Sequence, residues 1–202
     1  MHGRIIGLVL GGLAIGATVG LAVLPGALDR LGLIAPLPAV GKAQIGGPFS
    51  LIDHTGRRVT DKDFRGHYLL VFFGFTFCPD VCPAALQVMA AALDRLGSNA
   101  ERVTPLFITI DPERDTPERL AQYVQSFHPR LIGLTGTPDE IRTVASAYRV
   151  FHKKMKDESS TSDYGMEHTA IIYVMDPTGE FVTHFTHATP LDTMVAGLAR
   201  VL

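Results

Sequence analysis

Two continuous apolar runs constrain the fold of this chain more than any other feature. The first reads YLLVFF over Tyr68–Phe73, and the second reads TPLFITI over Thr104–Ile110. An uninterrupted apolar run is typical of a strand that is buried on both faces, whereas a half-exposed strand alternates apolar and polar residues. Such strands need a covering layer on each side of their sheet, which helices supply in α/β proteins. The two runs therefore predict an α/β domain with helices on both faces.

Capping and turn signals place the other elements around these strands. Thr116-Pro117 and Thr137-Pro138 each put a Thr N-cap before a Pro at the first helical position, and Glu140 completes a capping box. The turn sequences DHTG (53–56) and DPTG (176–179) each separate two short apolar runs and predict hairpins. Strands are expected at 49–52, 57–59, 68–73, 104–110, 169–175 and 181–185, and helices at 84–96, 116–127, 138–147 and 190–202. A polar, lysine-rich loop is expected over 153–162.

The resulting order is hairpin, β, α, β, α, α, β-hairpin, α. Alternating strands and helices followed by a hairpin predict a mixed sheet. This is the order of a thioredoxin-like fold with an N-terminal β-hairpin extension. With 47% apolar and 19% charged residues among 202, the chain has enough apolar material for such a core.

A long uncharged segment precedes the predicted domain. Ile5–Leu24 contains 20 residues without a charge, and a helix of that length spans about 30 Å, the thickness of a bilayer core. A cleaved signal peptide would have a shorter apolar region of about 7–15 residues, so we favour an uncleaved transmembrane anchor. Arg4 and the α-amine favour a cytoplasmic N-terminus with the remainder of the chain on the other side.

These signals give a four-part organisation. We expect a cytoplasmic N-terminus (1–4), a transmembrane helix (5–24), a Pro- and Gly-rich linker (25–46) and a folded domain (47–202). A presequence rich in Arg and Ser is not seen before the anchor, which favours a bacterial inner-membrane protein with its domain in the periplasm. The formal net charge of −2 argues against a nucleic-acid-binding protein.

The chain has two cysteines, Cys78 and Cys82, which exclude a multi-disulfide scaffold. They directly follow the first buried strand, at the predicted start of a helix, where free N–H groups lower the pKa of a thiol. Residues i and i+4 share one helical face, so both thiols could bind one metal ion or form a redox disulfide. The spacing is one residue longer than the Cys-x-x-Cys of thioredoxin-type enzymes.

A metal site with two thiolates calls for a third ligand, and the chain has eight histidines. His184 and His187 flank the end of a predicted strand and give only a weak signal. His168 is the better candidate because it stands where the polar loop enters the strand at 169–175. In a thioredoxin-like sheet, the start of that strand lies beside the start of the cysteine-bearing helix.

Four blocks of the sequence resemble the SCO/SenC family of membrane-anchored copper chaperones for cytochrome c oxidase assembly. They occur in the family's order over about residues 47–185, and together they are specific. The blocks are FGFTFCPDVCP (73–83), FITIDPERDTP (107–117), GLTG (133–136) and EHT (167–169). One departure is Glu167, where the family usually has Asp.

The resemblance implies that Cys78, Cys82 and His168 bind copper as both Cu(I) and Cu(II), and that the protein is a metallochaperone rather than an enzyme. Soft thiolates suit Cu(I), and imidazole also supports Cu(II). The implied partner is the oxidase subunit that carries the binuclear copper site, with other copper chaperones or a thioredoxin-like reductant as further partners. The alternative function is a thiol-disulfide oxidoreductase that keeps the oxidase cysteines reduced, and a peroxidase-like function is a third hypothesis.

Overall fold

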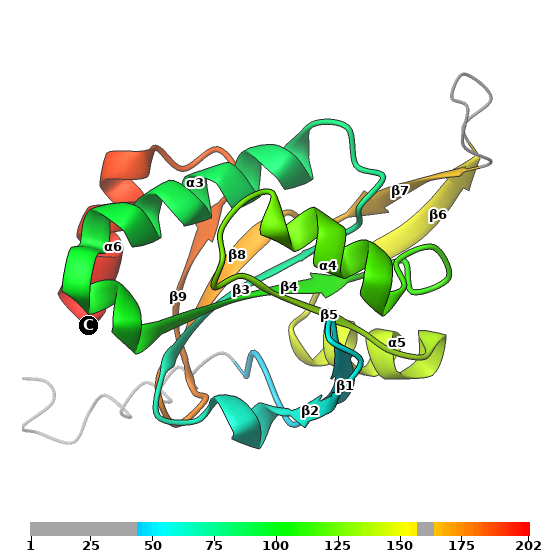
Figure 1. Ribbon diagram of the computed structural model, residues 1–202, viewed down its shortest axis with the longest axis horizontal. Coiled ribbons are helices and arrows are strands. Elements are labelled where there is room, and N and C mark those ends of the chain that lie inside the picture. Colours follow the sequence, from blue (N-terminus) through cyan, green and yellow to red (C-terminus); the bar gives the residue numbers. More distant parts are fainter. Residues whose placement is uncertain (1–43, 157–163) are drawn as a thin grey trace, which may run out of the picture. The chain divides into compact units, whose positions relative to one another are not determined.

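The structure, a computed structural model, describes residues 44–156 and 164–202 (Figure 1). The predicted anchor at 5–24 and nearly all of the predicted linker lie outside these ranges, so both stay predictions. Within the described ranges, no helix has the length and apolar character needed to cross a bilayer.

A seven-stranded mixed sheet forms the centre of the domain, in the order β2-β1-β5-β4-β3-β8-β9. β3 lies in the middle, parallel to β4 on one side and antiparallel to β8 on the other. A second, two-stranded sheet consists of β6 and β7. The strands are β1 Ser50–Asp53, β2 Arg58–Thr60, β3 Tyr68–Gly74, β4 Val103–Thr109, β5 Ile132–Thr135, β6 His152–Lys156, β7 Tyr164–His168, β8 Ile171–Met175 and β9 Phe181–Thr186.

Helices cover both faces of the large sheet. α3, α4 and α6 lie over one face and α5 lies on the other (Figure 1). Neighbouring residues of a strand point to opposite faces. Accordingly, Phe72 of β3 packs against Phe107, which contacts Tyr123 of α4, whereas Phe73 contacts Tyr148 directly after α5. The helices are α3 Val81–Leu96, α4 Pro117–Gln125, α5 Pro138–Ala147 and α6 Leu191–Val201, with 3-10 helices η1 Asp61–Phe64 and η2 Gly97–Arg102.

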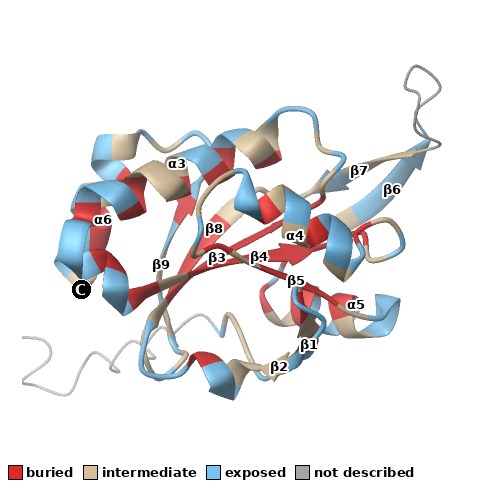
Figure 2. Cartoon of the chain, viewed as in Figure 1, coloured by how far each residue is buried: buried red, intermediate tan, exposed pale blue. Residues whose placement is uncertain are grey.

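The core lies along β3 and β4, which are buried through almost their whole length (Figure 2). This confirms the two apolar runs as doubly covered strands. Both helix caps are also confirmed, because the Thr116 hydroxyl accepts a hydrogen bond from the Arg119 N–H, and Thr137 and Glu140 form a capping box. The mixed sheet with helices on both faces is therefore the predicted one.

Three features differ from the prediction: the strands β5 and β7 are additional, and the expected polar loop is partly a strand. β5 was not predicted, because it has only four residues and one of them is Gly133. That glycine lets α4 approach closely, since a Cβ there would lie 3.1 Å from Leu120 Cβ and Val124 Cγ1. The expected polar loop over 153–162 is wrong for its first part, because His152–Lys156 forms β6 and pairs antiparallel with β7. β6 is largely exposed and rich in lysine, so it has no apolar alternation to indicate a strand; residues 157–163 lie outside the described residues.

Candidate metal centre

The loop after β3 carries the first cysteine. The Cys78 N–H donates to the Phe75 carbonyl at 3.2 Å and closes a tight turn over 75–78. Helix α3 begins only at Val81, with Asp80 as its N-cap. The helix therefore begins three residues before the expected range of 84–96. The expectation that Cys78 opens the helix is wrong, because Cys82 is in the first helical turn and Cys78 precedes the helix.

Pro83 explains this late helix start. A helix beginning one residue earlier would need the N–H of residue 83 to donate to the Pro79 carbonyl, and proline has no N–H. With Asp80 as N-cap, Pro83 occupies the third helical position, where no intrahelical donor is needed. The first helical hydrogen bond then runs from the Ala84 N–H to the Asp80 carbonyl, at 3.1 Å.

The structure brings Cys78, Cys82 and His168 together. Their ligand atoms all lie within 4.8 Å of one another, and no other such group of His, Cys, Asp and Glu exists within the described residues. Cys82 Sγ lies 3.6 Å from His168 Nε2, and the Cys82 N–H donates to Cys78 Sγ at 3.3 Å. Cys82 is fully buried, whereas Cys78 and His168 are half-buried, so the group is reachable from solvent on one side.

The two thiols have opposite electrostatic character. Hydrogen bonds from the Cys82 thiol and from His168, together with the N–H groups of Cys82 and Asp80, lower the pKa of Cys78 to about 4 despite partial burial. The hydrogen bond to Cys78, burial and the charge on Cys78 all raise the pKa of Cys82 above the ordinary thiol range. At neutral pH, Cys78 is therefore a thiolate and Cys82 is its hydrogen-bond donor.

His168 presents its Nε2 atom to the thiols. Its Nδ1 lies 3.1 Å from the Thr169 carbonyl, and an Nδ1–H donated there holds the ring so that Nε2, which donates to Cys78 in the metal-free protein, would offer its lone pair to a metal ion once it gives up its hydrogen. The rings of Phe72 and Phe75 contact the imidazole edge-on, with centroids 6.2 and 6.0 Å away. His168 is the last residue of β7, and three residues later the chain enters β8 beside β3. The position expected from the topology of the sheet is thus where the structure places it.

Several supporting residues were missed in the sequence. Asp115 is fully buried and accepts hydrogen bonds from the Thr76 N–H (3.0 Å), the Thr76 hydroxyl (2.6 Å) and the Thr109 hydroxyl (2.6 Å). It therefore fixes the turn that carries Cys78. Gly74 leaves the space that Cys82 occupies, since a Cβ there would lie 2.7 Å from Cys82 Sγ.

The weaker histidine candidates do not join this group. His184 is exposed and stacks on Phe181 of the same strand, and the His187 N–H donates to the Ala170 carbonyl. His152 faces His168 across β6 and β7, but it is not among the residues whose ligand atoms converge.

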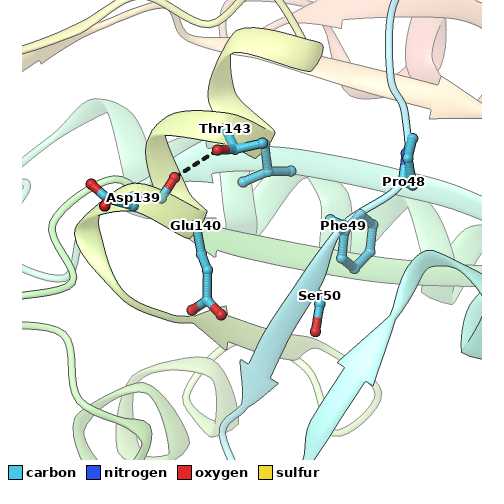
Figure 3. Close-up of a pocket in the computed structure, with 7 residues that line it drawn as sticks. Pro48, Phe49, Ser50, Asp139, Glu140 and Thr143 are labelled. Carbon is cyan, nitrogen blue, oxygen red and sulfur yellow. Dashed lines mark hydrogen bonds between the residues drawn. The ribbon is translucent and has the colours of Figure 1, made fainter.

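A groove of about 440 Å³ lies elsewhere, between the start of β1 and the first turn of α5 (Figure 3). The polar side chains Glu140 and Thr143 in this groove already form hydrogen bonds at the start of α5. Glu140 accepts from the Thr137 N–H and pairs with Arg58, and the Thr143 hydroxyl donates to the Asp139 carbonyl at 2.8 Å. The groove contains no thiol or imidazole, so we assign it no part in metal binding.

The fold and the site together define a class: a thioredoxin-like domain that carries a Cys-Cys-His group where β3 leads into α3. The comparison with known families then gives the particular one. The chain belongs to the SCO1/SenC family, whose model matches residues 38–202.

Individual relatives agree with this membership. The chain is 46% identical over 164 residues, 81% of its length, to Protein SCO1 homolog 1, mitochondrial, of Arabidopsis thaliana. It is 52% identical over 149 residues, 72% of its length, to Protein SCO1 homolog, mitochondrial, of Homo sapiens. The matched regions span only 48% and 49% of those two proteins, so the chain spans about half the length of these relatives.

Solved structures of relatives contain copper. Arabidopsis thaliana ScoI with copper bound matches with a TM-score of 0.74 and 45% identity, covering 77% of this chain and 96% of that one. Bradyrhizobium japonicum ScoI with copper bound matches with a TM-score of 0.72 and 46% identity, covering 78% and 99%. Copper is thus the metal found in relatives, and this chain has a Cys-Cys-His group able to hold a metal ion.

Proposed function

We propose that this protein is a copper metallochaperone that holds copper on Cys78, Cys82 and His168 and delivers it to the binuclear copper site of cytochrome c oxidase. The observation that carries the proposal is the convergence of the three ligand atoms within 4.8 Å, one of them on a strand far along the chain from the other two. Family membership and the copper in related structures support it.

The chemistry of the donor set fits a cargo that must be held and then released. Two thiolates suit Cu(I), and an imidazole beside them also supports Cu(II). A structural zinc site closes its coordination with four protein ligands, whereas three ligands with a half-exposed thiol leave a side open for transfer. Copper binding also requires deprotonated thiols, and Cys78 already meets this condition at neutral pH.

The proposed location follows from the segment before the domain. Residues 5–24 would anchor the chain in a bacterial inner membrane, with the copper-binding domain on the periplasmic side. That is the side on which a copper-site subunit of the oxidase could reach the half-exposed Cys78. Fractionation of the source cells tests this placement, and recovery of the protein in the soluble fraction would contradict it.

The direct test is metal analysis of the full chain, purified in detergent with a thiol reductant and Cu(I). We expect about one copper per chain for the unmodified protein, and loss of copper for Cys78→Ser and Cys82→Ser. His168→Ala should lose the Cu(II) complex most strongly, since imidazole is the ligand better suited to Cu(II). His184→Ala is the matched control, because that imidazole is exposed and outside the group. Full retention of both copper states in His168→Ala would contradict the ligand assignment.

One observation favours a second function, a thiol-disulfide reductase. The sulfurs of half-buried Cys78 and buried Cys82 lie within 4.8 Å of each other, and the lowered pKa of Cys78 beside the raised pKa of Cys82 suits an attacking thiol and a resolving thiol. The Cys78 thiolate would attack a partner disulfide and release one partner thiolate. Cys82 would then attack the mixed disulfide, which releases the second partner thiol and leaves a Cys78–Cys82 disulfide for a thioredoxin-like reductant to reduce.

The two functions separate on His168. Reduction of a disulfide needs both cysteines and no imidazole ligand, whereas copper delivery needs all three residues. A His168→Ala variant that still reduces a model disulfide, at a rate lowered only by the loss of one of the hydrogen bonds to Cys78, but loses Cu(II) would show that the thiols have both capacities. Loss of disulfide reduction in that variant would contradict the separation.

A further inference from the structure

Arg114 lies in the loop between β4 and α4 and contacts three separate parts of the site. Its Nε donates to the carboxylate of Asp111, which is completely buried. Its Nη1 donates to the Tyr164 carbonyl, the first residue of β7, at 3.0 Å. Only 17% of the arginine side chain is exposed, so both interactions are largely shielded from solvent.

Aromatic rings surround the same guanidinium. Its Cζ lies 3.8 Å from the ring centroid of Tyr164, 4.5 Å from that of Phe77 and 6.0 Å from that of Phe75. Phe75 and Phe77 belong to the turn that ends at Cys78, and Tyr164 belongs to the strand that ends at His168. Cation–π contacts of this kind strengthen when the cation is removed from water.

Tyr164 closes the arrangement from the other side. Its hydroxyl donates to Asp111 Oδ1 at 2.8 Å, while Arg114 binds the other oxygen of that carboxylate. The buried Asp111 therefore holds the cation and the tyrosine together. One arginine thus joins the cysteine turn, the β4–α4 loop and β7.

This bridge matters because β6 and β7 pair with each other and are not strands of the seven-stranded sheet. The thiols are placed by β3 and α3, whereas His168 is placed by β7. Main-chain hydrogen bonds of the large sheet hold the His168 end of β7 through β8, which begins three residues later, but they do not hold its Tyr164 end. Side-chain contacts must therefore set the distance between the Tyr164 end of β7 and the cysteine turn.

We propose that Arg114 is a positioning residue of the metal centre: it holds β7 against the cysteine turn and so keeps His168 at bonding distance from the thiols. Arg114 is not itself a ligand, because guanidinium has no lone pair to offer. The inference rests on the proposed function only in taking His168 as a copper ligand. Partners outside the ligand shell typically change metal affinity by about 10–100-fold.

The test uses the full chain and four substitutions, two of them also in combination with His168→Ala. Arg114→Met removes the charge and the hydrogen bonds, and Arg114→Lys keeps the charge beside Asp111 if the first variant folds poorly. Lys154→Met is the matched control, because Lys154 also lies over the Tyr164 ring, at 4.6 Å, but its ion pair with Glu113 is about half exposed. His168→Ala is combined with each arginine variant.

We expect Arg114→Met to weaken Cu(II) binding by at least about tenfold and to alter the electron paramagnetic resonance spectrum of the Cu(II) complex. Cu(I) affinity, measured by competition with a chromophoric chelator, should change by less than about threefold, because both thiolates remain. In the His168→Ala background, the same substitution should cause no further loss of Cu(II) affinity. Arg114→Lys should be intermediate, and Lys154→Met should match the unmodified protein.

Amide hydrogen exchange of the metal-free protein provides a readout that does not depend on copper. Exchange over Tyr164–His168 should accelerate in Arg114→Met and stay unchanged in Lys154→Met. Unchanged exchange together with unchanged Cu(II) binding would overturn the positioning role. A loss of Cu(II) affinity that adds fully to that of His168→Ala would also overturn it, because the effect would then not pass through His168. Normal Cu(II) binding by His168→Ala would instead refute the proposed ligand set.

Discussion

The substitution Gly74→Ala tests whether the space beside Cys82 is as limited as the structure shows. The new Cβ would lie 2.7 Å from Cys82 Sγ, 2.8 Å from Phe107 Cε2 and 3.2 Å from Phe72 Cε1. Ordinary contacts begin at 3.4 Å, so the sulfur would have to move by 0.7 Å or more. The two phenylalanines are fully buried on adjacent paired strands and have little freedom to move. The displacement must nevertheless be shared between Cys82 and the Phe107 ring, which lies 2.8 Å from the new Cβ.

The expected cost has two parts. Overpacking a core by one methyl group destabilises the folded state by about 1–3 kcal/mol. Replacing glycine by alanine offsets about 0.4–1 kcal/mol of this, because it lowers the conformational entropy of the unfolded chain. We therefore expect a net loss of about 1–2 kcal/mol in the free energy of unfolding. Because Cys82 Sγ lies only 3.6 Å from His168 Nε2, the same displacement disturbs the convergence of the ligand atoms. Copper affinity should fall along with stability.

Urea unfolding and Cu(I) competition measure the two effects on the same samples. Gly165→Ala is the matched control, because it adds the same methyl group to a strand where a Cβ meets nothing within 4 Å. That variant should keep its copper affinity and lose no stability. If Gly74→Ala unfolds within about 0.5 kcal/mol of the unmodified protein and binds copper equally well, the reasoning about this space is refuted.

Three further predictions concern thiol reactivity, the cysteine turn and the response to acid. In the copper-free protein at pH 6, iodoacetamide should modify Cys78 at least about tenfold faster than Cys82, because Cys78 is a half-buried thiolate and Cys82 is a buried thiol. Mass spectrometry measures the two rates, and equal rates would contradict this. Asp115→Ala should lower the free energy of unfolding, measured in urea, by about 2–4 kcal/mol, because the substitution leaves the donors of Thr76 without an acceptor. A loss under about 1 kcal/mol would show that the turn does not depend on Asp115. Burial opposes the ionisation of Asp53, but hydrogen bonds from Thr55 and Arg57 outweigh burial and lower the pKa of this carboxyl. The contribution of Asp53 to folding stability is therefore present above its unfolded pKa of 3.8 and is lost as the pH falls below that value. Asp53→Asn should therefore flatten the decline of stability between pH 5 and pH 3, and an unchanged slope would contradict the assignment.

The elements that the sequence predicted well are those with strong local signals. β3 and β4 are apolar throughout, and the helices α4 and α5 each begin with a Thr-Pro pair. The missed elements depend on partners elsewhere in the chain. β5 is a four-residue strand, and its Gly133 is explained only by the close approach of α4. The lysine-rich β6 is a strand because β7 pairs with it. No local pattern indicates either partner.

The same distinction applies to the site. Cys78, Cys82 and His168 could be grouped from the sequence, because the order of elements predicts which strand enters beside the cysteines. The residues that support this site, Asp115 and Gly74, could not be predicted, because the atoms that they contact approach them only in the folded sheet. The helix start was misplaced because Pro83 sets it: residue 83 has no N–H to donate to the Pro79 carbonyl, so the helix begins at Val81.

The unequal thiols follow from that one displaced helix start. If α3 began at Pro79, both sulfurs would lie on one helical face. Since Pro83 delays the helix, Cys78 remains in a turn at the surface and Cys82 lies inside the first helical turn, where Gly74 gives it room. The accessible sulfur is the charged one, and the buried sulfur is the one beside His168. Under either proposed function, an incoming metal ion or partner sulfur would therefore meet Cys78 first and engage Cys82 second.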